Sequence, residues 1–140
     1  MSTVLWANVL SAGRVKSDQS DHVALYKHAE KLDAMAQALD LPSFMSICDT
    51  TDQEISMGER ELPAGMASSD ELMAAQGSWM PMEDAITLLT HLRDHVVAEH
   101  TRFGLFGHHH AEVVEELNDV LAFVQAEAPH AEEFNFSVVS

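Results

Sequence analysis

The fold is decided by the stretch His110-Ala-Glu-Val-Val-Glu-Glu-Leu-Asn-Asp-Val-Leu-Ala-Phe-Val-Gln-Ala-Glu127, which is followed by Pro129 and then by Phe134-Asn-Phe-Ser-Val-Val139. In its first part, apolar residues recur at steps of three and four, which predicts an amphipathic helix with one buried stripe. In its last part, Phe134, Phe136 and Val138 alternate with other residues, most of them polar. This period of two predicts a strand with an apolar inner face and a largely polar outer face.

Residues Thr3 to Leu10 predict a second strand, because Val, Leu and Trp favour a pleated surface and both faces are largely apolar. We expect four helices. The first is at about Asp21–Leu39, the second follows the capping-box residues Ser68–Glu71, the third runs from Pro81 to about His100, and the fourth is the long helix that ends at Glu127. Residues 41–66 show no regular pattern, and within them we expect one 3₁₀ turn at Phe44–Ile47. These features predict one α+β domain over residues 1–140. It should be predominantly helical, with about four helices covering a small sheet of the N- and C-terminal strands.

The chain is strongly acidic, with 23 Asp and Glu against 7 Lys and Arg and a formal net charge of −16. This balance argues against binding to nucleic acid or to an anionic membrane, since both need a basic face. It fits either a basic protein partner or a solvated acidic surface. No run of residues reaches membrane length, and the single cysteine, Cys48, permits no internal disulfide. We therefore expect a cytoplasmic protein of bacterial type.

Acidic residues gather in two stretches that contain no Lys or Arg, one between Leu32 and Glu59 and the other after Arg102. An aromatic side chain ringed by carboxylates resembles the anchor of a binding surface, and Phe123 has this position in helical phase. Alternatively, another segment covers Phe123 and the acids are merely solvated. The candidate partner-binding residues are Glu112, Glu115, Glu116, Asp119 and Phe123, followed by Asp49, Asp52 and Glu54.

Nine histidines suggest a second kind of site, because two histidines four residues apart on a helix can chelate a transition metal. His91 and His95 have this spacing, and His108, His109 and His110 open the last helix. Three consecutive helical residues point in different directions, however, and no third ligand stands at a recognisable spacing. Solvated or partly packed histidines are the alternative, and no cofactor is predicted.

Signals for an enzyme are weak. Cys48 is the only thiol, and its neighbours Phe44, Met45 and Ile47 favour a buried and inert side chain. No phosphate-binding glycine loop, dinucleotide fingerprint or serine-hydrolase motif is present in the sequence. The sequence therefore favours a protein without catalytic activity.

Several stretches resemble a family of small uncharacterised bacterial proteins. They are Thr3–Asn8, Ala24–Asp33, Glu61–Met66 with Ser69–Met73, Arg102–Leu105 and Phe134–Val139. The resemblance extends in patches along the whole chain but implies no activity and no site residue. From the residues themselves we expect a protein-interaction module that binds a basic partner in the manner of an inhibitor or immunity protein. A histidine-based metal-binding protein, or a small enzyme of unknown reaction, remains the alternative.

Overall fold

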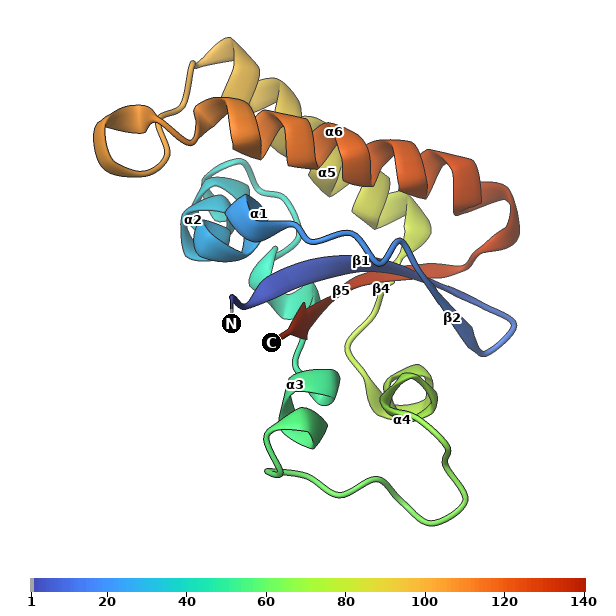
Figure 1. The fold of residues 1–140 in the computed structure, drawn as a ribbon. Coiled ribbons are helices and arrows are strands. Elements are labelled where there is room, and N and C mark those ends of the chain that lie inside the picture. Colours follow the sequence, from blue (N-terminus) through green and yellow to red (C-terminus); the bar gives the residue numbers. More distant parts are fainter. Residues whose placement is uncertain (1) are drawn as a thin grey trace.

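Five strands form one sheet, and six α-helices lie on its two faces, in a computed structural model that describes residues 2–140 (Figure 1). The strands are β1 (Val4–Ser11), β2 (Arg14–Ser17), β3 (Cys48–Asp49), β4 (Met80–Pro81) and β5 (Glu133–Val139). The helices are α1 (Val23–Lys27), α2 (Ala29–Ala38), α3 (Thr51–Ser56), α4 (Ser69–Gln76), α5 (Met82–Ala98) and α6 (His110–Glu127). Short 3₁₀ turns occupy Met45–Ile47, Leu105–Gly107 and Ala128–His130.

Strand β5 organises the sheet, because it pairs with three other strands. It lies antiparallel to β1, with Val4 opposite Val139 and Leu10 opposite Glu133. The two-residue strands β3 and β4 pair with β5 in parallel and antiparallel orientation, respectively. Strand β2 forms an outer edge against β1. The predicted pairing of the first and last strands is confirmed, within a sheet larger than expected.

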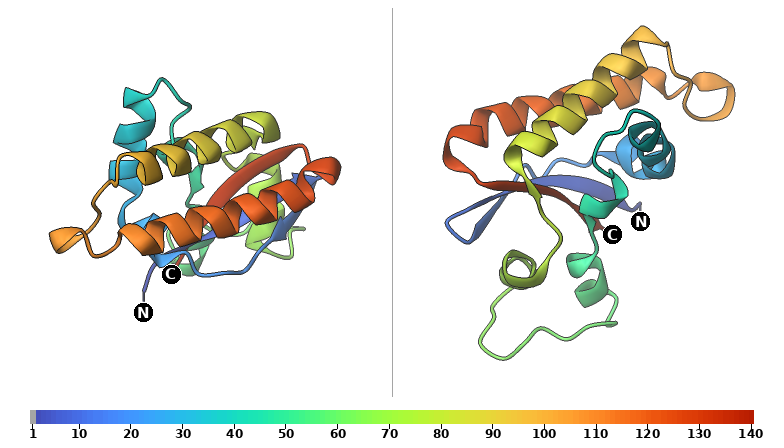
Figure 2. Two further views of the ribbon diagram at one scale, coloured as in Figure 1. Left: turned by 90° about the horizontal axis from the view of Figure 1, so that it is seen from above. Right: turned by 180° about the vertical axis from the view of Figure 1, so that it is seen from behind.

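The molecule has three layers. A hairpin of α5 and α6, together with α1 and α2, covers one face of the sheet, and α3 and α4 cover the other (Figures 1 and 2). The main core lies on the hairpin side, where Leu5, Ala7 and Val9 of β1 meet Phe134 and Phe136 of β5. The apolar stripes expected for the two long helices are buried there. They comprise Leu88, Leu89, Leu92 and Val96 of α5 and Val113, Leu117, Val120, Leu121 and Val124 of α6.

The helix count differs from the four expected because one helix is divided and another was missed. The expected helix Asp21–Leu39 breaks at His28, whose φ of −111° and ψ of 19° lie outside the helical range. Residues 41–66 contain β3 and α3 as well as the 3₁₀ turn at Met45–Ile47. Strand β3 has two residues and α3 has six, which is too short for a hydrophobic period to show.

The outer face of β5 is not exposed to solvent, contrary to the expectation from its polar residues. Asn135 is completely buried, and Ser137 is only 5 % exposed. Their neighbour across the sheet, Asn8 of β1, is also buried. The layer formed by α3 and α4 covers these groups, and hydrogen bonds among them satisfy their polar atoms.

Among residues 2–140, no helix combines the length and the apolar character that crossing a lipid bilayer requires.

Candidate functional site

A groove runs along the outer side of the helical hairpin. We call it the α5/α6 groove, and it has a volume of about 550 Å³. Its lining includes Val97 and His100 from the end of α5 and Ala111, Val114, Glu115 and Asp119 from α6. Val97 and Val114 each follow a core residue, so the helical turn of about 100° directs them away from the core stripe. The groove therefore has an apolar floor, and carboxylates lie on its α6 side.

The loop joining α5 to α6 exposes two large apolar side chains at the end of this groove. Leu105 and Phe106 are each 78 % exposed, and we call them the hairpin tip. Figure 1 shows this loop projecting beyond the ends of both helices. Phe106 has a φ of +63° between Gly104 and Gly107, whose φ values are also positive. A non-glycine residue in this region is strained, so the loop holds the aromatic ring outward at a conformational cost.

The acidic residues predicted on α6 do not share one face. Glu115 and Asp119 line the α5/α6 groove. Glu112 is exposed in the first turn of the helix. Phe123 is partly buried and packs against the core, which corresponds to the alternative in which another part of the molecule covers the ring.

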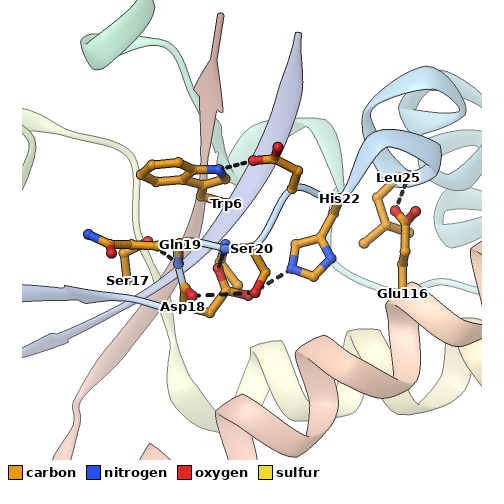
Figure 3. A network of polar contacts seen from close by, with 10 residues as sticks. Trp6, Ser17, Asp18, Gln19, Ser20, His22, Leu25 and Glu116 are labelled. Atoms are coloured by element: carbon orange, nitrogen blue, oxygen red, sulfur yellow. Dashed lines mark hydrogen bonds and ion pairs between the residues drawn. The ribbon is translucent and has the colours of Figure 1, made fainter. Parts of the chain in front are cut away.

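Glu116 is turned toward α1 and has a structural role. Its carboxylate accepts hydrogen bonds from the backbone N–H groups of Ala24 at 3.1 Å and Leu25 at 3.0 Å (Figure 3). Burial raises the pKa of Glu116, while the two backbone hydrogen bonds act in the opposite direction. Glu116 therefore stabilises the start of α1.

The second predicted acidic group lies on the other side of the sheet, in and around α3. Asp49 is buried and accepts hydrogen bonds from the backbone N–H groups of Thr51 and Ser78 at 2.9 and 2.8 Å. Asp52 accepts one from the Ser69 hydroxyl, and Glu54 lies 3.8 Å from Arg60. The structure therefore places the two acidic groups in separate layers, and a single flat partner would not contact both.

The predicted histidines are divided between two parts of the molecule, the middle of α5 and the start of α6 with the loop before it. His91 and His95 line a shallow hollow with Leu39 and Leu41. His108 packs edge-on against Phe106, while His110 Nδ1 lies 2.6 Å from the Thr101 carbonyl oxygen. Within residues 2–140, no group of three or more His, Cys, Asp or Glu side chains is arranged to hold a metal ion.

His109 makes a contact that its position in the sequence did not indicate. Its Nδ1 lies 2.8 Å from Nε2 of His28, at the break between α1 and α2. The His28 ring also packs against Phe103, with 5.3 Å between the ring centroids. Burial, and next the neighbouring His109, lower the pKa of His28. This pair joins the hairpin loop to the α1–α2 segment.

A buried acid–histidine pair, also missed from sequence, supports the crossing from β2 to α1. His22 Nε2 lies 2.7 Å from Asp18 Oδ2, and Asp18 Oδ1 accepts hydrogen bonds from the backbone N–H groups of Ala7 and Ser20 (Figure 3). The His22 side chain is only 3 % exposed. Such shielding from solvent fits a structural role, because a catalytic base needs access to its substrate.

Cys48 is not suited to nucleophilic chemistry. Its thiol lies 3.5 Å from the Phe44 carbonyl oxygen. Burial, with a further contribution from the charge of Asp33, raises the pKa of Cys48 to about 12. Because the thiolate is the reactive form, this thiol is almost entirely protonated at neutral pH.

No protein-family model, curated protein or solved structure matches this chain. The α5/α6 groove and the hairpin tip form the most extensive accessible apolar surface described above. It combines accessible apolar surface with carboxylates.

Proposed function

We propose that this protein is a non-enzymatic interaction module that binds a basic protein partner through the α5/α6 groove. The observation that carries the proposal is the apolar groove itself, which has Glu115 and Asp119 on its α6 side and the exposed hairpin tip at its end. An inhibitor or immunity-type role, in which the protein neutralises a cationic partner, fits this surface.

The charge of the chain supports a cationic partner. The net charge is −16, and no Lys or Arg follows Arg102 in the sequence, so α6 carries only acidic charges besides its histidine. A surface of one sign raises the rate of encounter with an oppositely charged protein, and salt screens this effect. The carboxylates would thus govern association, with Lys or Arg of the partner meeting Glu115 and Asp119.

The apolar part of the surface would govern how long the complex lasts. Val97 is 47 % exposed and the two residues of the hairpin tip are 78 % exposed. A few buried anchors, aromatic side chains among them, contribute most of the binding energy of an interface, and the apolar contacts around them exclude water. A partner segment with apolar residues on one side and Lys or Arg beside them matches this arrangement, as in helix-in-groove recognition.

The test compares immobilised protein with two double charge reversals in a capture experiment from the native host. The groove variant is Glu115→Lys with Asp119→Lys. The matched control is Glu83→Lys with Asp84→Lys, which changes two exposed acids in the first turn of α5. Both variants receive the same change in net charge, so only the position of the charges differs.

We expect a basic protein that the wild type and the control retain and that the groove variant loses. Retention should be stronger at about 50 mM salt than at physiological salt, because the encounter is electrostatic. If all three forms retain the same proteins, or if no basic protein is retained at either salt concentration, the proposal is wrong.

A further inference from the structure

The loop between α5 and α6 is joined at its base to the break between α1 and α2. The Nδ1 atom of His109 lies 2.8 Å from Nε2 of His28. Lys31 donates to the Arg102 carbonyl oxygen, and its ammonium group lies 5.0 Å from the centre of the Phe103 ring. Phe103 itself is completely buried. These contacts hold the base of the loop, while the hairpin tip beyond them is exposed (Figure 1).

His109 fixes the shape of the loop as well as its attachment. Its backbone N–H donates to the Phe103 carbonyl oxygen at 2.9 Å. Its ring lies over Gly104, where an added β-carbon would come within 2.5 Å of His109 Nδ1. Gly104 has a φ of +74° and directly precedes the hairpin tip. Displacement of the His109 ring would therefore release the segment that carries the tip.

The hydrogen bond between the two histidine rings depends on how many protons they hold. Such a bond joins one N–H donor to one nitrogen lone pair. Two neutral rings can form it, and so can a pair with one extra proton, because the charged ring still donates. When both rings are charged, each facing nitrogen bears a hydrogen and the two positive charges repel one another. The second proton therefore breaks the contact, and the two rings titrate as a coupled pair.

The surroundings of His28 mostly oppose a positive charge on its ring. Burial lowers its pKa most, and His109, Lys27 of α1 and Lys31 of α2 lower it further. Glu112 of α6 acts in the opposite direction. The closed loop thus disfavours the doubly charged pair, and by linkage the doubly charged pair disfavours the closed loop. Opening lets the ring of His28 reach water, where its pKa has the ordinary value of 6.5.

We propose that the His28–His109 pair is a proton-sensitive latch that releases the α5–α6 loop in mildly acidic solution. Above about pH 7 the rings are joined and the loop is closed. Below about pH 6 the pair takes up its second proton, the contact opens, and the hairpin tip loses its fixed position at the end of the α5/α6 groove. The latch is a property of the free chain, and only its effect on a partner rests on the proposed function.

The test measures amide hydrogen exchange in the isolated protein at pH 7.5 and pH 5.0. Each rate is divided into the rate of an unfolded chain at the same pH, which gives a protection factor. The His109 backbone N–H reports on the loop, and the amides that pair β1 with β5 report on the global fold. The latch variant is His28→Gln, whose side chain cannot take up a proton. The matched control is His91→Gln, which removes an exposed histidine from α5.

We expect the protection factor of the His109 amide to fall at least about tenfold from pH 7.5 to pH 5.0 in the wild type and in His91→Gln, while the β1–β5 amides stay protected. In His28→Gln the factor should be the same at both pH values, whatever its level, because the pair can no longer hold two charges.

A wild-type protection factor that does not change with pH would overturn the latch. The same fall in His28→Gln as in the wild type would also overturn it, and so would a parallel loss of protection in the β1–β5 amides, which would indicate global unfolding. None of these outcomes depends on a partner, so failure of the latch is distinguishable from failure of the proposed function.

Discussion

The Glu116 carboxylate accepts a hydrogen bond from the Leu25 backbone N–H at 3.0 Å, across 91 residues of sequence. Leu25 lies in the first turn of α1, whose own N-cap residue, His22, makes no side-chain capping bond. The first N–H groups of a helix need acceptors, and negative charge is favourable near them. A residue of α6 thus caps α1 and joins the hairpin to the segment that follows β2.

Replacing Glu116 by alanine should destabilise the protein by about 1–2 kcal/mol, because the N–H groups of Ala24 and Leu25 lose their acceptor. Urea denaturation measures the change. Glu115→Ala is the matched control, because the Glu115 carboxylate is exposed at the neighbouring position. This substitution should lower the free energy of unfolding by less than about 0.5 kcal/mol. An equal effect of the two substitutions would contradict the capping role.

The His28–His109 pair should make stability depend on pH below neutrality. The pKa of His28 is lowered from its ordinary value of 6.5, so the unfolded chain binds a proton more readily than the folded protein does. The contribution of His28 to the free energy of unfolding is therefore fully present above pH 6.5. It is lost as the pH drops from 6.5 toward the lowered pKa.

Denaturation of the wild type and of His28→Gln between pH 8 and pH 5 isolates the contribution of the His28–His109 pair, because the seven histidines outside the pair are common to both proteins. The stability difference between the wild type and the variant should shrink, or change sign, toward acid. A difference that is constant across this range would show that His28 does not titrate with folding.

Cys48 should react slowly with thiol reagents. Its pKa is about 12, against an ordinary value of 9.0. This difference reduces the thiolate fraction at pH 8 by about a thousandfold, and the thiolate is the nucleophile. We expect alkylation by iodoacetamide to be at least about 100-fold slower than that of free cysteine, and to reach the free rate only after unfolding in urea. Fast reaction of the folded protein would reopen the alternative of a cysteine enzyme.

The hairpin tip should show a conflict between stability and binding. Asparagine tolerates a positive φ better than phenylalanine does, so Phe106→Asn should stabilise the protein by about 0.5–1 kcal/mol. If the proposed interface is right, the same substitution weakens partner binding. Leu105→Asn is the control, because Leu105 is equally exposed but has no positive φ, and it should leave stability unchanged. The thermal unfolding midpoint should rise for Phe106→Asn and stay at the wild-type value for Leu105→Asn. Equal midpoints for the two variants would contradict the strain at Phe106.

Periodicity along the chain was sufficient to predict the long helices and the end strands. Val113, Leu117 and Val124 recur at helical spacing, and all three are buried where the pattern indicated. Phe134, Phe136 and Val138 likewise face the core. These predictions succeed because a single segment contains the whole pattern, and burial of one face determines its structure.

The polar face of the sheet and the short elements were not predictable in the same way. Asn135 and Ser137 alternate as residues on a solvent-facing surface do, yet α3 and α4 bury them. Nothing in a local pattern distinguishes a polar residue in water from one in a satisfied internal network. Glu115 and Glu116 differ in environment because α1 lies beside Glu116. Helix α1 is 92 residues away from Glu116 in the sequence, so no local pattern shows this contact.

The pairing of β5 with β1, β3 and β4 has a consequence for biosynthesis. Leu5 pairs with Val138, so about 130 residues must be translated between the two partners. At about 5–20 residues per second, the interval is on the order of ten seconds. During that time β1 can pair with β2, which follows it directly in the chain, but its edge toward β5 has no partner, and free strand edges are prone to aggregate. The β5-facing edge of β1 is therefore open to such contacts until β5 emerges from the ribosome.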